Sequence, residues 1–318
     1  MNTLSFYMDQ ASQKSYNILI TVIIPCYNQA HYLGEAIESV LAQSYPHIEI
    51  LVIDDGSPDN TAEVAAKYDQ VRYIRQENQG LSGARNTGIR ESTGQYLVFL
   101  DADDRLVPDG LQAGINCFHV HPECAFVSGH HRYIKGDGSL LNEYPQEWID
   151  PDPYLALLKD NYIGMCATVM YKREVFEKVG NFKTSLKSCE DYDLYLRIAC
   201  QFPVARHSQM VAEYRWHETN MTNNAKRMLQ SALTALGSQW EYVQQKPEYI
   251  KAYQTGIKFW RNYFGQRLLE QIGQNIQKNQ GKALLQNSWQ LLRYFPLWGH
   301  TLWQELMIAI EAKKTNPY

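Results

Sequence analysis

Phe99-Leu100-Asp101-Ala102-Asp103-Asp104 places three carboxylates directly after an apolar run, residues 96–100, that is typical of a buried strand. Carboxylates gathered at a strand end repel one another and are costly to bury without a cation. Mg²⁺ usually meets protein through one or two carboxylates and takes its other ligands from water and substrate phosphates. The stretch therefore predicts a metal site for a phosphate-bearing substrate. The alternative is a solvated acidic turn.

Strands and helices alternate on both sides of this stretch. We expect strands at residues 18–24, 48–53, 71–74 and 96–100, and helices between them at 33–41, 61–68 and 80–92. This alternation indicates βαβ units, an α/β fold class and a mostly parallel sheet. Ligands of such sheets bind beyond the carboxyl ends of the strands. The turns at 25–28, 54–57 and 101–104 are therefore expected to converge on one crevice.

Composition narrows the class of protein. The 318 residues are 45% hydrophobic and 20% charged, as in a globular protein. The six cysteines show no C-x-x-C pair and no zinc-ligand spacing, which favours a reduced, cytoplasmic protein. Residues 1–17 are polar and lack the apolar core of a signal peptide. No apolar run reaches the roughly 18 residues that a bilayer crossing needs, so we expect a soluble or peripheral protein.

Charge divides the chain into regions of opposite sign. Residues 226–318 carry 12 Lys/Arg and 5 Asp/Glu, whereas the first 225 residues carry 18 and 29. Five of the seven tryptophans lie in the basic part. We expect a polar N-terminal extension at 1–17, an α/β domain at 18–225 and a helical region at 226–318. The last is either a helical bundle that packs its aromatic residues against the α/β domain or a basic, Trp-bearing surface at the inner face of a membrane.

Five short motifs occur in a recognisable order. They are Ile23–Asn28, Asp54–Ser57, Gly83–Gly88, Asp101–Asp104 and Glu190–Leu194. Together they resemble glycosyltransferase family 2, the inverting, nucleotide-sugar-dependent enzymes of the GT-A fold, over about residues 18–222. The resemblance implies a GT-A (Rossmann-like), mostly parallel sheet flanked by helices, here with a helical C-terminal appendage.

The resemblance also implies a donor site. Its residues would be Pro25, Tyr27, Asn28, Asp54, Asp55, Arg85, Asp101 and Ala102. Asp55 resembles an aspartate that accepts the N3–H of uracil, although Asp54 could do this instead and one of the two could cap the turn. Arg85 resembles a residue that approaches the nucleotide, where a guanidinium suits base or phosphate oxygens. Its alternative is a surface arginine on a helix. Asp101 is expected near the ribose.

A divalent metal, Mn²⁺ or Mg²⁺, is the implied cofactor. Asp103 and Asp104 match the motif that reaches the ion in the family. His217, after the expected last strand, is a further candidate ligand, and an imidazole would favour Mn²⁺. A single histidine is also commonly structural.

Asp191 is the candidate general base. Inversion at the anomeric carbon needs a group that removes the proton of the acceptor hydroxyl, and a carboxylate can do this. Glu190 and Asp193 either orient the acceptor or cap the helix that opens at this motif.

The expected activity is transfer of a sugar from a nucleotide donor, UDP above all, to a hydroxyl of a glycan or lipid-linked acceptor, as in cell-envelope polysaccharide synthesis. The Gln-x-x-Arg-Trp motif of processive synthases is missing, which favours single addition. A sugar nucleotidyltransferase would need a Gly-rich, basic loop where the chain has residues 25–30, Pro-Cys-Tyr-Asn-Gln-Ala. A non-catalytic nucleotide-sugar-binding protein is the other alternative. Nucleic-acid binding is not expected, because no recognised binding motif accompanies the modest basic excess.

Overall fold

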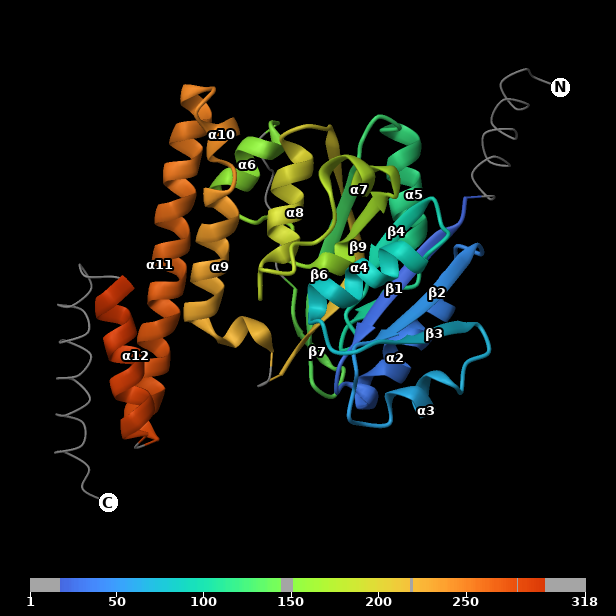
Figure 1. Ribbon diagram of the computed structural model, residues 1–318, viewed down its shortest axis with the longest axis horizontal. Coiled ribbons are helices and arrows are strands. Elements are labelled where there is room, and N and C mark those ends of the chain that lie inside the picture. Colours follow the sequence, from blue (N-terminus) through green and yellow to red (C-terminus); the bar gives the residue numbers. More distant parts are fainter. Residues whose placement is uncertain (1–17, 144–150, 218–219, 279, 295–318) are drawn as a thin grey trace. The chain divides into compact units, whose positions relative to one another are not determined.

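The computed structural model describes residues 18–143, 151–217, 220–278 and 280–294 (Figure 1). The expected polar extension at 1–17 lies outside the described residues, as do Trp298 and Trp303. The chain divides into two compact units. The first comprises Met1–Leu157 and Asn161–Glu218, and the second comprises Leu158–Asp160 and Thr219–Tyr318. The predicted boundary at residues 225 and 226 falls inside the second unit.

One sheet organises the first unit. Its strands are β1 (Ile20–Cys26), β2 (Ile48–Asp54), β3 (Val71–Arg75), β4 (Tyr96–Phe99), β5 (Arg105–Leu106), β6 (Phe126–Lys135), β7 (Leu140–Asn142), β8 (Val169–Lys172) and β9 (Val204–Trp216). Their order is β3-β2-β1-β4-β8-β6-β9-β5, with β7 on β6. The predicted parallel pairing holds among β1 to β4 and recurs between β6 and β9. The pairs β4–β8, β6–β8, β6–β7 and β5–β9 are antiparallel, so the sheet as a whole is mixed.

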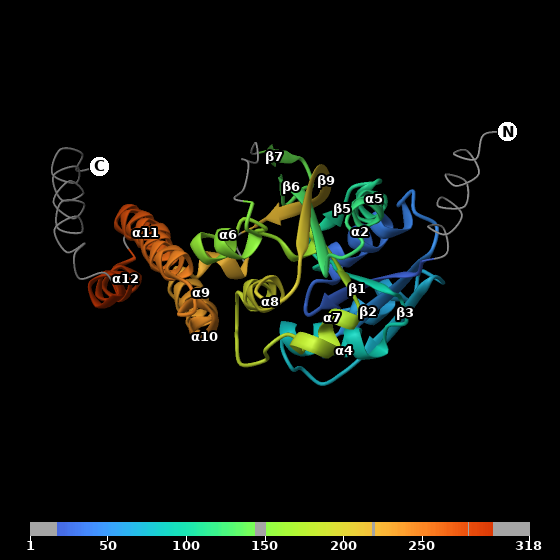
Figure 2. The same ribbon diagram turned by 90° about the horizontal axis from the view of Figure 1, so that it is seen from above.

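Helices cover both faces of this sheet. They are α2 (Ala30–Leu41), α3 (Thr61–Ala65), α4 (Leu81–Glu91), α5 (Gly110–Val120), α6 (Pro153–Lys159), η1 (Cys166–Thr168), α7 (Glu174–Val179) and α8 (Glu190–Ala199). Figure 2 shows α2 and α5 on one side of the sheet and α4 and α7 on the other. Strands that are buried on both faces need nearly continuous apolar sequence, which explains the run of β1.

Successive side chains of β1 point alternately to the two faces of the sheet. Ile20, Val22 and Ile24 belong to the core that also holds the apolar stripe of α2. Ile23 faces α4, where an added Cβ on Gly88 would lie 2.2 Å from the Ile23 Cγ2 atom. The glycine therefore lets α4 approach β1 closely, and this approach sets the position of every side chain on α4.

The second unit is helical. After η2 (Met221–Asn223) come α9 (Ala225–Gly237), α10 (Trp240–Val243), α11 (Pro247–Gln277) and α12 (Gly281–Tyr294). Residues of α9, α11 and α12 share an apolar core that includes Leu229, Phe264, Leu268 and Leu291. Trp260 packs against this core of the second unit, whereas Trp289 is 56% exposed. Within the described ranges, no helix combines the length and the apolar character needed to cross a membrane.

Candidate active site

The turns that follow β1 and β2 are joined by hydrogen bonds. The Asp55 N–H donates to the Cys26 carbonyl oxygen at 2.9 Å, and the Asn28 N–H donates to Ser57 Oγ at 3.1 Å. Asn28 has a φ of 56°, a left-handed conformation that asparagine tolerates better than most residues. Tyr27, next to it, is 52% exposed, whereas Pro25 is buried within β1. Of this predicted turn, Tyr27 and Asn28 therefore remain accessible to a ligand.

The carboxylate of Asp54 is buried and bonded to neighbouring residues of the protein. Its side chain has no exposed surface. One carboxylate oxygen accepts from the Ser57 N–H at 2.7 Å, and the other accepts from Tyr73 Oη at 2.5 Å and from Arg75 Nη1 at 2.8 Å. This geometry gives Asp54 the capping role and leaves no surface for the nucleobase contact that was its other possibility.

Asp55 holds the start of α4. Its Oδ1 accepts from Gln76 Nε2 at 2.7 Å and from the Gln79 N–H at 2.9 Å, and its Oδ2 accepts from the Gly80 N–H at 2.8 Å. Gly80, the N-cap of α4, has a φ of 79° that favours glycine. A carboxylate has about four acceptor positions, so these three bonds leave one unused, on a side chain that is 3% exposed.

Arg85 joins two motifs that are far apart in the sequence. Its guanidinium donates to Asp101 Oδ1 at 2.8 Å and to Glu190 Oε1 at 2.6 Å. The side chain is 2% exposed and lies over the Phe182 ring, so the alternative of a surface arginine is wrong. Burial lowers its pKa, but the carboxylates of Asp101 and Glu190 outweigh this effect and hold the pKa well above its ordinary value. The cation thus ties the end of β4 to the start of α8.

Asp191 has the electrostatics of a base. Burial, followed by the negative charge of Glu190, raises its pKa from 3.8 to about 7, although Arg85 opposes the shift. Its Oδ1 accepts from the Tyr192 N–H at 2.7 Å. A pKa near the working pH favours proton transfer in either direction.

Asp193 belongs to the framework instead. It is fully buried, and its two oxygens pair with Lys183 and with Arg197, each at 2.7 Å. Arg197 also donates to the carbonyl oxygens of Val179 and Asn181, so the aspartate anchors the loop before α8. The structure therefore favours this role over contact with an acceptor. Glu190, 5% exposed and bonded to Arg85, is likewise better placed to position its neighbours.

The predicted metal residues separate into two groups. Asp103 Oδ2 lies 2.9 Å from His217 Nε2, although 114 residues separate them. Asp104 is buried, and its Oδ1 accepts from the Arg215 N–H at 2.8 Å. Burial, together with the charges of Asp103 and Asp101, raises the pKa of Asp104 well above its usual range. Asp104 therefore joins this turn to β9, whereas the carboxylate of Asp103 pairs with the imidazole of His217.

The Asp103–His217 pair fits a divalent cation. Neighbouring ligands of an octahedral ion with bonds of about 2.0–2.1 Å lie roughly 3 Å apart, close to the observed separation. No group of three or more His, Cys, Asp or Glu side chains in the described part of the chain is arranged to hold a metal. Two protein ligands suffice for an ion that takes its remaining ligands from a diphosphate and water.

A stack of side chains supports this pair, and the sequence did not reveal it. The buried Arg215 donates to the Asp103 carbonyl oxygen at 2.7 Å and to Glu35 Oε2 at 2.6 Å. Its Cζ lies 4.7 Å from the centre of the Tyr32 ring, which in turn stacks on His217. The sequence does contain a clue to this stack. Arg215 and His217 are two residues apart, so in an extended strand their side chains point to the same face.

Ala102 completes the predicted set. It is 3% exposed and packs in the core on the α2 side of the sheet, so only its backbone could meet a donor. Asp101 keeps 34% of its side chain exposed beside Arg85. The groups at this edge that keep exposed surface include Tyr27, Asn28, Asp101 and the Asp103–His217 pair, and Arg85 links Asp101 to Glu190, the neighbour of Asp191.

The chain is similar in sequence to known proteins. A sequence model described as Glycosyl transferase family 2 matches residues 21–180. An uncharacterized glycosyltransferase of Rickettsia typhi is 33% identical over 226 residues, which span 69% of this chain and 70% of that protein. TuaG of Bacillus subtilis, a glycosyltransferase named for teichuronic acid biosynthesis, is 30% identical over 65% of this chain and 82% of its own length.

Two solved structures share the fold. TarS 1–349 of S. aureus in complex with UDP-GlcNAc superposes with a TM-score of 0.63 at 16% identity, covering 87% of this chain and 81% of that one. A mannosyltransferase of Pyrobaculum calidifontis in complex with GDP-Man and Mn²⁺ gives 0.61 at 18% identity, covering 98% and 94%. Both are GT-A glycosyltransferases, which confirms the expected fold.

Proposed function

This chain belongs to glycosyltransferase family 2, and from that membership we propose that it transfers a sugar, with inversion, from a UDP donor to a hydroxyl of a glycan or lipid-linked acceptor. Asp191 would act as the general base. A divalent cation would be held by Asp103 and His217. The relative named for teichuronic acid biosynthesis supports a cell-envelope glycan as the acceptor.

One observation carries the proposal: the buried guanidinium of Arg85 bonds both Asp101 and Glu190. Asp101 belongs to the motif expected beside the donor, and Glu190 immediately precedes the candidate base Asp191. A fork-shaped cation can hold two carboxylates in fixed geometry, which a lysine ammonium does less well. Donor-side and acceptor-side groups therefore meet at one residue.

The residues of the chain divide the chemistry among them. Asp191 takes the proton of the acceptor hydroxyl while the new bond to the anomeric carbon forms and the nucleoside diphosphate departs. General-base assistance of this kind contributes about 10²–10⁴-fold. Glu190 and Arg85 set the charge around that base, and Asp55 offers its remaining acceptor position to the N3–H of the uracil.

The cation would be Mn²⁺ or Mg²⁺. When bound, it offsets the charge that grows on the diphosphate leaving group. The imidazole of His217 favours Mn²⁺ over Mg²⁺, and the Mn²⁺ bound to the mannosyltransferase of the same fold is in keeping with this choice.

Position at the inner face of a membrane is the second part of the proposal. Leu285, Trp289 and Leu292 are 74%, 56% and 48% exposed, and their spacing places them on one face of α12. Arg293 lies 5.0 Å from the Trp289 ring. Such a face can enter an anionic interface. We expect Trp289→Ala to reduce flotation with anionic liposomes and Trp240→Ala, which removes another exposed tryptophan, to leave it unchanged. Equal flotation of both variants would contradict this contact.

The activity is tested by UDP release from a panel of UDP-sugars with Mn²⁺, with and without glycan acceptors. We expect Asp191→Asn to bind UDP almost as the natural protein does and to lose transfer. A nucleotide-sugar-binding protein without catalysis would release no UDP, and a nucleotidyltransferase would instead form the nucleotide-sugar from a sugar phosphate. Transfer at the natural rate by Asp191→Asn would remove this residue from the role.

A further inference from the structure

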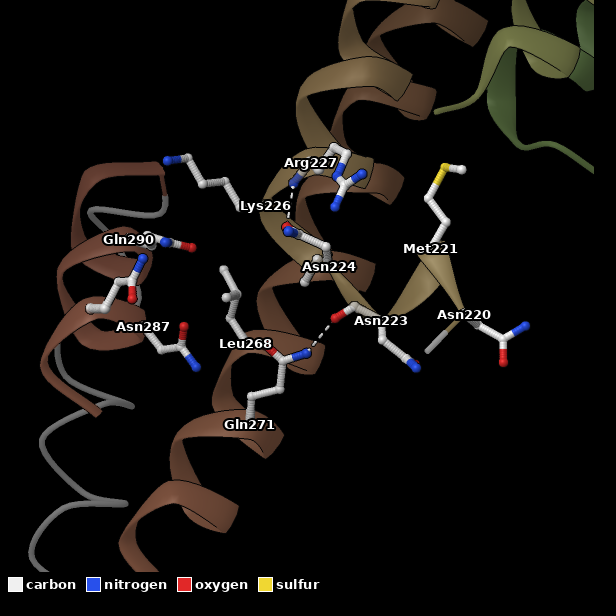
Figure 3. A pocket seen from close by; sticks show the side chains of 12 residues that line it. Asn220, Met221, Asn223, Asn224, Lys226, Arg227, Leu268, Gln271, Asn287 and Gln290 are labelled. Carbon is white, nitrogen blue, oxygen red and sulfur yellow. Dashed lines mark hydrogen bonds between the residues drawn. The ribbon is translucent and has the colours of Figure 1, made fainter. Parts of the chain in front are cut away.

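A polar cleft lies within the helical second unit. It has a volume of about 580 Å³, within the range of about 300–1,000 Å³ that is usual for small-molecule sites. The residues that line it come from η2, α9, α11 and α12, all of which belong to the second unit. In Figure 3, the side chains of α12 face those of η2 and α9, with Leu268 and Gln271 of α11 between them.

Amide side chains dominate this cleft, which we call the amide cleft. Seven of its 12 lining residues are Asn or Gln: Asn220, Asn223, Asn224, Gln271, Gln286, Asn287 and Gln290. Lys226 and Arg227 also line it, and no carboxylate does. A surface rich in amides offers both donors and acceptors, and the two cations add a local positive charge.

Part of this lining is held in place by the fold. Gln271 Nε2 donates to the Asn223 carbonyl oxygen at 2.8 Å, and Asn224 Oδ1 accepts from the Arg227 N–H at 3.0 Å as the cap of α9. The first bond ties η2 to α11, and the second caps the first turn of α9. The cleft is therefore formed before any ligand arrives, which lowers the entropic cost of binding.

Gln290 points to a ligand. Its side chain lines the cleft and is 8% exposed. Among the described residues it has no hydrogen-bond partner. Its amide oxygen and nitrogen are therefore available to accept from and donate to a polar molecule in the cleft.

Sugar hydroxyls are the groups that match an amide, because each both donates and accepts. Lys226 and Arg227 add a preference for a carboxylate or phosphate. We propose that the amide cleft is a second saccharide site that binds an acidic segment of the acceptor glycan. This inference rests on the proposed function only in taking the acceptor to be a glycan. None of its residues belongs to the stretch that matches the family.

Binding of defined oligosaccharides to the full chain tests the proposal. Tetragalacturonate is the acidic probe, maltotetraose the neutral one, and inorganic phosphate reports attraction of a simple anion. By calorimetry we expect tetragalacturonate to bind at least tenfold more tightly than either of the others. Failure of tetragalacturonate to bind, or equal binding of all three probes, would overturn the assignment.

Matched variants locate the site. Lys226→Ala combined with Arg227→Ala should weaken tetragalacturonate binding at least tenfold. Lys251→Ala combined with Arg261→Ala removes the same charges from exposed positions of α11 outside the cleft and should not weaken it. Equal losses in the two double variants would show non-specific attraction and overturn the proposal.

Gln290→Met tests the amide itself, because methionine keeps the length of the side chain and removes its polar atoms. We expect weaker binding of both oligosaccharides with an unchanged melting temperature. A variant that binds both as the natural protein does would contradict the role of Gln290. UDP release by the natural protein is measured separately. It tests the proposed transferase activity alone, so failure of that activity can be told apart from failure of this binding site.

Discussion

Replacing Asp191 with asparagine should make the protein more stable while abolishing its activity. The carboxyl has a pKa of about 7 in the folded chain, against an ordinary value of 3.8. Between these values the folded state binds more protons than the unfolded state, so stability falls as pH rises from about 4 to about 7. The shift corresponds to at most about 4 kcal/mol. An amide carries no such charge, and it still accepts the Tyr192 N–H.

The gain in stability should therefore depend on pH. At pH 8 the buried Asp191 is almost fully ionised, and nearly all of the resulting loss of stability is present. At pH 5 only a part of that loss is present. The free energy of unfolding of Asp191→Asn, relative to the natural protein, should thus be roughly 3 kcal/mol larger at pH 8 than at pH 5. Urea unfolding followed by circular dichroism at both pH values measures this difference.

Asp193→Asn is the matched control on the same helix. Asp193 is buried between Lys183 and Arg197, so neutralising it leaves two cations without their carboxylate. This should destabilise the protein at both pH values, by about 3–5 kcal/mol. The two substitutions, two residues apart, should then have opposite signs. Equal stability gains of Asp191→Asn at pH 5 and pH 8 would refute the reasoning.

The same pKa sets the pH profile of the natural enzyme, in which kcat/KM should rise with pH and level off above about 7. Asp103→Ala should remove the Mn²⁺-dependent part of UDP binding, and unchanged affinity with Mn²⁺ in calorimetry would contradict the assignment. Arg85→Met should cost about 3–5 kcal/mol because Glu190 stays buried without a cation, and adding Glu190→Gln should restore most of the lost melting temperature. Gly88→Ala should cost about 1–3 kcal/mol in urea unfolding through overlap with Ile23, and natural stability would show that α4 shifts freely.

Local sequence was enough for the first half of the sheet. The apolar runs of β1, β2 and β4 and the spacing of Leu33, Ala36 and Ile37 in α2 predicted these elements within three residues of their observed ends. Parallel strands carry their carboxyl ends to one edge, so the turns after β1, β2 and β4 had to lie together there. The strands after residue 108 pair with partners far along the chain, in parallel for β6–β9 and antiparallel for β4–β8 and β6–β8, and local sequence does not specify such partners.

The acidic residues of the candidate site can be located in the sequence, but the sequence does not tell which distant side chain each of them meets. Three acidic residues stand at the start of α8, and nothing local distinguishes them. Folding pairs Glu190 with Arg85, surrounds Asp193 with two cations and leaves Asp191 without an ion-pair partner among the described residues, where burial raises the pKa of Asp191 to about 7. Burial and ion pairing act through space, so the role of each carboxylate depends on which distant side chains the fold brings against it.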